Sequence, residues 1–233
     1  MARSRCASVL PGSDGPVGGA AEAEQVARAI GFPLVIKASA GGGGRGITVV
    51  ERAADFVPAL QQTSHQARMV FGNGEVYLER YLPAARHVEV QILADTHGNV
   101  VHLGERDCSL QRRNQKLVEE SPSPGLDRAL ADRLGELAVT GARSLAYSGV
   151  GTMEFLVGPD GTATFMELNA RIQVEHPVTE MVTGIDLIRE QILVAAGEPL
   201  RFTQDDIRPS GVAIECRSTP RTRTRDSARH WVC

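Results

Sequence analysis

Residues 151–175 read "GTMEFLVGPDGTATFMELNARIQVE" and combine two strand-like runs with a turn. The runs "GTMEFLV" and "TATFMEL" flank "GPDG", a composition typical of a β-hairpin turn. From Glu167 onward, polar and apolar residues alternate. Because an extended chain has a side-chain period of two, one face of this segment would carry five polar residues: Glu167, Asn169, Arg171, Gln173 and Glu175.

The predicted hairpin places two carboxylates close together. If "GPDG" forms the loop, Glu154 pairs with Phe165, and Glu167 is its diagonal neighbour on the same face. Like charges at that separation are unfavourable unless a cation or proton lies between them. With the oxygen of Asn169, these hard ligands suit Mg²⁺ or Mn²⁺ held together with phosphates. The alternative is a solvated sheet face.

A glycine-rich stretch, "VIKASAGGGGRGITVV" at residues 35–50, joins two β-branched runs. It lacks the lysine and hydroxyl pattern of a P-loop, and it leads into a strand, whereas a Rossmann turn leads into a helix. What remains is a hairpin loop whose bare N–H groups can approach a phosphate, with Lys37 supplying a point charge. A flexible surface hairpin is an equal alternative.

The other segments predict an α+β protein. Strand-like runs occur in hairpins, and amphipathic helices lie between them rather than in a regular parallel series. We expect helices ending at Gly31, from Ala54 to Met69, over 126–146 and over 184–197, and strands over 75–82, 87–95 and 100–105.

Two further segments suggest anion chemistry. "ERDCSLQRRNQKLVEE", residues 105–120, is rich in charge, and most of its arginines are expected on a solvated face. Lys116 stands out because Lys37 is the only other lysine, and a flexible ammonium can follow an anion through a reaction. Arg171 can bind a small oxyanion with two hydrogen bonds, and Glu175 can take its proton. His176 is interpreted as structural.

Composition excludes several classes of protein. The 233 residues carry a net charge of -3 and are 42% hydrophobic, so nothing global favours nucleic acid or an anionic membrane. No apolar run approaches the roughly 20 residues of a membrane span. The four cysteines form no C-x-x-C pair, which argues against a zinc site. We expect a cytoplasmic protein, with an organellar transit segment at the N-terminus as a minor alternative.

Four motifs, "KASAGGGGRGI", "ERDCSLQRRNQK", "GTMEFLV" and "ELNARIQVEHPVTEMVTGIDL", together resemble the biotin carboxylase family of ATP-grasp enzymes. The likeness runs from about Leu10 to Arg217. It implies an ATP-grasp fold in which two subdomains with antiparallel sheets grip ATP. It also implies a glycine-loop lid over residues 9–82, a core with the metal and bicarbonate sites over 83–217, and an aberrant, disordered tail over 218–233.

The resemblance implies ATP-dependent carboxylation of biotin by bicarbonate through carboxyphosphate. Biotin would arrive on a carrier protein or domain, and a carboxyltransferase would use the product, as in acetyl-CoA carboxylase and fatty acid biosynthesis. A homodimer is a further expectation. The nucleotide-binding residues implied are Lys37, Gly42, Gly43, Gly44, Glu79, Leu82, His87 and Gln111, and the Mg²⁺ or Mn²⁺ ligands are Glu154, Glu167 and Asn169.

The same resemblance implies the groups that handle bicarbonate and biotin. Glu175 would deprotonate bicarbonate, and Arg217 would stabilise the biotin enolate. The bicarbonate ligands implied are Lys116, Arg171, Gln173 and the backbone of Val174.

Two alternatives stay open. One is another ATP-grasp ligase, such as a carbamoyl-phosphate or peptide-type ligase, which the stretch "RIQVEHPVTE" disfavours. The other is a truncated, inactive remnant that binds MgATP only. It is supported by the few residues before "PGSDGPVG" and by the tail "STPRTRTRDSARHWVC", where the family continues into further domains.

Overall fold

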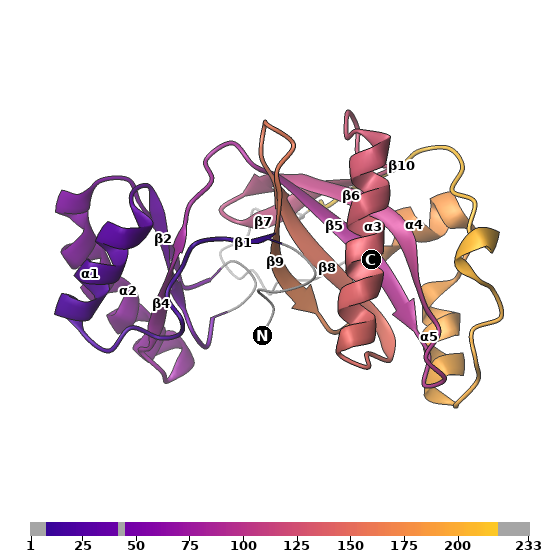
Figure 1. Cartoon of the computed structure of the whole chain (residues 1–233), viewed down its shortest axis with the longest axis horizontal. Helices are drawn as coiled ribbons and strands as arrows, with labels where there is room; N and C mark the ends of the chain where they lie inside the picture. The colour runs from indigo at the N-terminus through magenta and orange to yellow at the C-terminus, as the bar shows by residue number, and fades with distance from the viewer. Residues whose placement is uncertain (1–7, 42–44, 219–233) are drawn as a thin grey trace, which may run out of the picture.

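The computed structural model describes residues 8–41 and 45–218, which form two sheets lying side by side (Figure 1). The large sheet has the order β1-β9-β8-β5-β6-β7-β10, and the small sheet has the order β3-β2-β4. β1 runs parallel to β9, and the other neighbouring strands are antiparallel. The α+β class is confirmed.

The small sheet carries two helices on its outer side (Figure 1). Apolar side chains of α1 and α2, such as Ala23, Ala27 and Leu60, pack against Leu34 and Leu78. The second helix has Pro58 in its first turn, where a missing N–H costs no hydrogen bond. The elements of this part are α1 (Ala20–Ile30), β2 (Leu34–Ala38), β3 (Ile47–Val50), η2 (Ala53–Asp55), α2 (Phe56–Phe71) and β4 (Val76–Arg80).

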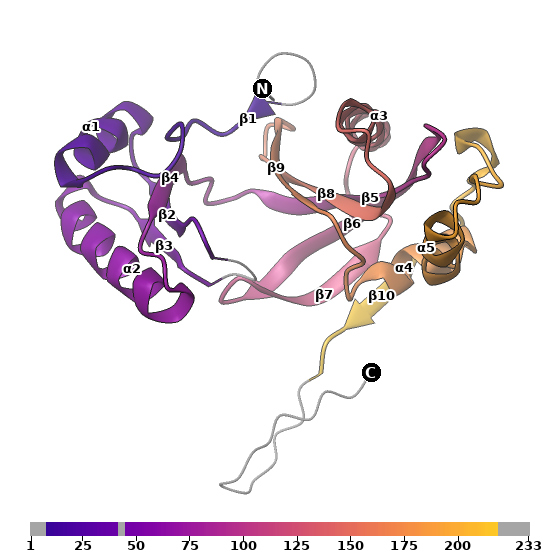
Figure 2. The ribbon, with the colours of Figure 1, turned by 90° about the horizontal axis from the view of Figure 1, so that it is seen from below.

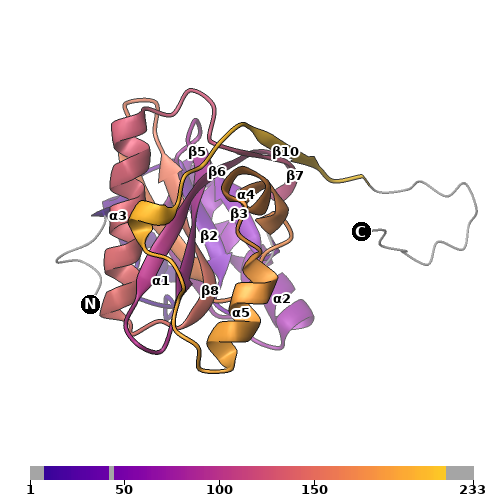
Figure 3. The same ribbon diagram turned by 90° about the vertical axis from the view of Figure 1, so that its right-hand side faces the viewer.

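The large sheet is covered on both faces (Figures 2 and 3). α3 packs on one face, against Val88, Val90 and Ile92, while Leu93 and Leu103 contact the α5 side. The elements of this part are β1 (Ser8–Val9), β5 (Arg86–Ala94), β6 (Val100–Arg112), β7 (Gln115–Ser121), α3 (Arg128–Ser144), β8 (Gly149–Val157), β9 (Ala163–Asn169), α4 (His176–Thr183), α5 (Leu187–Ala195), η3 (Gln204–Asp206) and β10 (Ala213–Cys216).

Bulges shift the pairing register at several points of the large sheet. Glu154 pairs with Glu167 while Phe155 pairs with Phe165, so Met166 is an extra residue in β9. The prediction that Glu154 faces Phe165 is therefore wrong, and the two carboxylates are directly opposite. Likewise, Leu110 pairs with Val118 while Gln111 pairs with Lys116, so Leu117 is an extra residue in β7.

The extended face predicted as far as Glu175 is also wrong, because β9 ends at Asn169. Residues 170–173 are irregular, residues 174 and 175 form a turn, and α4 begins at His176, with Pro177 in its first turn. The fixed φ of proline and its missing N–H suit that position. His176 lies in a helix and pairs with no strand; its Nδ1 lies 2.8 Å from the carbonyl oxygen of Gln173.

Some expectations lie outside the described residues. These are the phosphate loop of Gly42, Gly43 and Gly44, and the tail from residue 219 onward. No helix in residues 8–41 and 45–218 has the length and apolar character to cross a membrane.

Candidate active site

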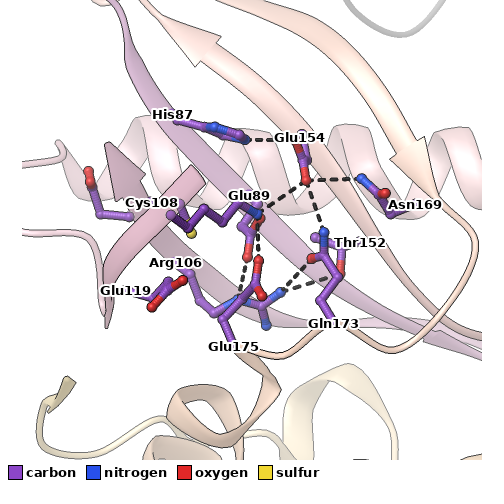
Figure 4. Close-up of polar contacts among 12 residues, drawn as sticks. His87, Glu89, Arg106, Cys108, Glu119, Thr152, Glu154, Asn169, Gln173 and Glu175 are labelled. Atoms are coloured by element: carbon purple, nitrogen blue, oxygen red, sulfur yellow. Dashed lines mark hydrogen bonds and ion pairs between the residues drawn. The ribbon is translucent and has the colours of Figure 1, made fainter. Parts of the chain in front are cut away.

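A buried polar cluster lies on the face of the large sheet that α4 covers (Figure 4). In β5, Val88 and Val90 point to the α3 core, so the alternating Glu89 and Gln91 point to the opposite face. Glu89 is directly opposite Arg106 of β6, and Glu154 of β8 is directly opposite Glu89 on the other side. Three adjacent strands thus deliver charged groups to one place.

Arg106 is the centre of this cluster and is fully buried. Its Nε donates to Glu89 at 2.7 Å, and its Nη1 donates to Gln91 at 2.7 Å and to Thr179 of α4 at 2.8 Å. Its Nη2 donates to Gln173 at 3.4 Å. The expectation of a solvated face for this charge run is wrong for Arg106, although Arg112 and Arg113 are exposed.

Lys116 joins three carboxylates. Its ammonium donates to Glu89, Glu175 and, at 3.3 Å, Glu154. Burial alone would lower the pKa of Lys116, but the surrounding carboxylates outweigh it and raise the pKa. Burial would raise the pKa of Glu89, but Arg106 and Lys116 hold it below its usual value. The lysine therefore stays charged.

Ligand-type atoms of His87, Glu89 and Glu154 lie within 4.8 Å of one another, as do those of Glu89, Cys108 and Glu175. The ammonium of Lys116 already contacts the carboxylates of both groups. These two clusters are therefore neutralised by a side chain of the protein.

Two of the predicted metal ligands, Glu154 and Asn169, lie together at the edge of this cluster (Figure 4), and the third, Glu167, is directly opposite Glu154 in the sheet. Asn169 donates through Nδ2 to Glu154 at 2.9 Å and to Glu167 at 3.1 Å. Two opposed carboxylates thus converge on one donor, and a divalent cation suits the same oxygens. Burial would raise the pKa of Glu154, yet the hydrogen bond to His87 and the charges of His87 and Lys116 lower it to about 2, so this carboxylate is anionic.

The nucleotide residues expected on the large sheet also meet this edge. His87 Nε2 lies 2.7 Å from Glu154, and its Nδ1 lies 2.8 Å from Gln111 Nε2. Since the Gln111 amide donates, Nδ1 accepts and the His87 proton lies on Nε2. Leu82 follows β4 in the segment that connects the two sheets.

The small sheet contributes Lys37 and Glu79, which form an ion pair. The Lys37 ammonium lies 5.9 Å from the centre of the Tyr77 ring. Burial and the charges of Glu79 and Glu167 raise the pKa of Tyr77 to about 12. Tyr77 lies on the small sheet and Glu167 on the large sheet.

The groups expected to bind bicarbonate fall into two sets. Glu175 bridges Lys116 and Arg217, with its Oε2 2.8 Å from Arg217 Nη2, and Gln173 donates to Glu154 at 3.0 Å. Arg171 is separate: it is exposed and donates to Asn169 at 3.2 Å. Val174 is 61% exposed in the turn before α4.

Sequence reasoning missed Glu89 and Arg106. The alternation in "HVEVQILAD" places Glu89 on the same face as His87, which is a signal that could have found it. Arg106 gives no such signal, because its burial depends on acceptors from two other strands and α4.

Two sheets that lie side by side, the small one carrying Lys37 and the large one carrying the paired carboxylates of Glu154 and Glu167, are the arrangement of an ATP-grasp protein. A family model described as "Carbamoyl-phosphate synthase L chain, ATP binding domain" matches residues 2–203, and the chain belongs to this family.

The relatives of this chain include biotin carboxylases. The chain is 56% identical over 208 residues to the chloroplastic biotin carboxylase of Arabidopsis thaliana, covering 89% of this chain and 39% of the relative. It is 51% identical over 210 residues to biotin carboxylase 1 of Bacillus subtilis, covering 90% of this chain and 47% of the relative. The resemblance carried by the four motifs is confirmed.

Solved structures agree. The biotin carboxylase domain dimer of Hydrogenobacter thermophilus 2-oxoglutarate carboxylase, in complex with MgADP, ADP and bicarbonate, has a TM-score of 0.88 and 49% identity, covering 91% of this chain and 47% of that one. A biotin carboxylase complex from Campylobacter jejuni has a TM-score of 0.89, 49% identity and coverage of 91% and 48%. This chain spans less than half the length of these relatives.

Proposed function

We propose that this chain carries out the chemistry of biotin carboxylase, the ATP-dependent carboxylation of biotin by bicarbonate. The observation that carries the proposal is the placement of Glu175 between Lys116 and Arg217, beside the carboxylate pair of Glu154 and Glu167. The proposed base Glu175, the cations Lys116 and Arg217, and the proposed metal ligands thus lie in one continuous network of polar contacts. The relative in complex with MgADP and bicarbonate supports the same substrates.

In this proposal the nucleotide lies between the sheets. Lys37 leaves Glu79 to hold the phosphates, and the loop of Gly42, Gly43 and Gly44 covers them. Glu79, Leu82, His87 and Gln111 line the remainder of the nucleotide site. Glu154, Glu167 and Asn169 hold Mg²⁺ or Mn²⁺, which neutralises charge on the phosphates when bound.

Bicarbonate is proposed to bind at Lys116, Gln173, the backbone of Val174 and Arg171. Glu175 takes the bicarbonate proton, an oxygen of bicarbonate forms a bond to the γ-phosphorus, and ADP leaves, which gives carboxyphosphate. Carboxyphosphate breaks to CO₂ and phosphate beside biotin, whose enolate oxygen is stabilised by Arg217. The released phosphate takes the N1′ proton of biotin, and N1′ then forms a bond to CO₂.

The partners follow from the proposed reaction. Biotin is presented by a carrier protein or domain, and a carboxyltransferase passes the carboxyl group on, as in the acetyl-CoA carboxylase system. A homodimer is proposed from the dimeric relative. We also propose residues 9–82 as the lid and 83–217 as the core, and a cytoplasmic location.

The test is ATP hydrolysis by the whole chain. We expect hydrolysis that depends on bicarbonate and rises when biotin is added. Glu175→Gln removes the base and should lower it by about 100-fold or more. Glu136→Gln, on the exposed side of α3, is the matched control. Binding of MgATP without any response to bicarbonate would favour the nucleotide-binding remnant, and hydrolysis driven by another acceptor would favour a different ATP-grasp ligase.

A further inference from the structure

Behind Arg217 lie two glutamates that the proposed reaction does not use. Glu119 of β7 is fully buried, and its Oε1 lies 2.6 Å from Arg217 Nη2. The same nitrogen contacts Glu175 at 2.8 Å. The guanidinium therefore connects the proposed base to a second, deeper carboxylate, and its Nε and Nη1 hydrogens stay outside these two ion pairs.

Glu215 of β10 is directly opposite Glu119 in the antiparallel ladder. Residues at such positions have Cβ atoms about 5 Å apart and side chains on one face. The Oε2 atoms of Glu119 and Glu215 are both buried, and neither has a hydrogen-bond donor in the described part of the chain. Two buried carboxylate oxygens without donors are costly, and one proton between them would satisfy both oxygens.

The local charges favour one proton on this pair. The Arg217 cation lowers the pKa of both glutamates, and the charge of Glu175 raises it. His176 and Arg106 also lower the pKa of Glu215, but by less than Arg217 does. Burial raises the pKa of Glu119 and of Glu215 more than Arg217 lowers it. Because Glu119 is the partner within 2.6 Å of Arg217, the charge belongs on Glu119 and the proton on Glu215.

The bulge in β7 explains why Glu119 reaches this position. Lys116 and Glu119 are three residues apart, so in a regular strand they would point to opposite faces. The extra residue in β7 relative to β6 turns both toward the polar cluster. The backbone N–H of Arg217 donates to Leu117, the residue in the bulge, at 2.9 Å.

We propose that Glu119 is a positioning residue that fixes the Arg217 guanidinium, and that Glu119 and Glu215 share a single proton at neutral pH. Arg217 then keeps one anionic partner when Glu175 becomes neutral by accepting a proton. The guanidinium stays in place, and its remaining donors point to the developing enolate. Only this last consequence depends on the proposed function.

The proton is tested by infrared spectroscopy of the whole chain at pH 7. We expect a carboxylic acid band in the wild type that disappears in Glu119→Gln and in Glu215→Gln. Both changes preserve side-chain shape, so folding is maintained. Absence of the band in the wild type, or its survival in both variants, would overturn the shared proton.

The positioning role is tested by NMR of the Arg217 guanidinium, identified by its loss in Arg217→Lys. A fixed guanidinium gives separate Nη signals. We expect separate signals in the wild type and in Glu215→Gln, because the new amide can donate a hydrogen bond to Glu119 as the protonated Glu215 does. In Glu119→Gln and in the shorter Glu119→Asp, the signals should merge. Separate signals in both Glu119 variants would overturn the role, whether or not the chain turns over ATP.

Steady-state kinetics of biotin-dependent ATP hydrolysis test the consequence for the proposed function. Glu119→Gln should raise KM for biotin by about tenfold and leave KM for ATP close to that of the wild type. Glu215→Gln should change neither strongly. Equal effects of the two variants on KM for biotin would contradict a specific role of Glu119. No biotin-dependent turnover in the wild type would refute the proposed function, while the two spectroscopic results would still decide this inference.

Discussion

Glu89 and Arg106 of the large sheet are completely buried, whereas Lys37 and Glu79 of the small sheet keep 16% and 25% of their side-chain surface exposed. In the large sheet each charge has several partners on neighbouring strands and α4. In the small sheet, Lys37 forms an ion pair with Glu79 and lies over the ring of Tyr77. The large sheet is thus built to hold a fixed arrangement of charges, and the small sheet to exchange partners when a ligand arrives.

The largest effect is expected at Arg106. Arg106→Leu leaves Glu89 buried without its main partner, and we expect the free energy of unfolding to fall by about 3 to 5 kcal/mol. Urea denaturation measures the change. Arg112→Leu, on the exposed end of β6, is the control and should stay within about 0.5 kcal/mol. Equal losses in the two variants would remove the contrast between buried and exposed arginines.

A smaller effect is expected at Asp95, in the turn between β5 and β6. Burial would raise its pKa, but hydrogen bonds from Asn99, His97 and Leu200 lower it to about 2. A folded pKa below the unfolded value of 3.8 stabilises the protein above pH 4, by about 2 kcal/mol. This contribution is lost as the pH falls from about 4 to about 2.

Asp95→Asn should therefore be less stable than the wild type at pH 7, with a difference that shrinks by pH 2.5. Urea denaturation at the two pH values measures it. Asp132→Asn, an exposed change on α3, is the control. A difference that stays constant with pH would contradict the assigned pKa.

The third prediction compares the two sheets as ligand sites. Glu154→Gln and Glu167→Gln should each weaken Mg²⁺-dependent binding of a nonhydrolysable ATP analogue by about tenfold, because each removes a charged oxygen from the metal edge. Lys37→Met should weaken binding both with and without Mg²⁺. Calorimetric titrations measure these affinities. Unchanged Mg²⁺ dependence in both glutamate variants would refute the proposal that Glu154 and Glu167 hold the same metal ion.

The smallest effect is expected in the small sheet itself. Glu79→Gln breaks the ion pair with Lys37, yet both groups are partly exposed, so the free energy of unfolding should change by less than about 1 kcal/mol. Thermal denaturation measures it. A loss as large as that of Arg106→Leu would show that the two sheets hold their charges in the same way.

The sequence predicted the parts of the site that lie within one hairpin. Glu154, Glu167 and Asn169 meet as expected, because alternation in two adjacent runs fixes their face. Their register could not be predicted, since the bulge at Met166 leaves no mark in the alternation. Gln173 and Glu175 reach the cluster through the segment just before α4, which the sequence had predicted as a continued extended strand.

Other parts depend on pairing between distant segments. Arg106 reads as one more surface arginine until Glu89, Gln91 and Thr179 are brought around it. The ladder between β7 and β10 brings Glu119 opposite Glu215, far apart in the sequence, and nothing local to either residue announces that contact. Short-range patterns fix faces; long-range register fixes partners.

The short strand β1 ties the chain before the small sheet to the large sheet. Ser8 and Val9 pair with β9, so the chain leaves that sheet after Val9 and returns to it at β5. Directly after Val9 the chain pairs with β4 of the small sheet, with Arg80 N donating to Pro11 O at 2.8 Å and Ser13 N donating to Leu78 O at 2.9 Å. Two short segments, one on each side of the small sheet in the sequence, therefore connect it covalently to the large sheet, and a protease cut in one of them leaves it attached by the other.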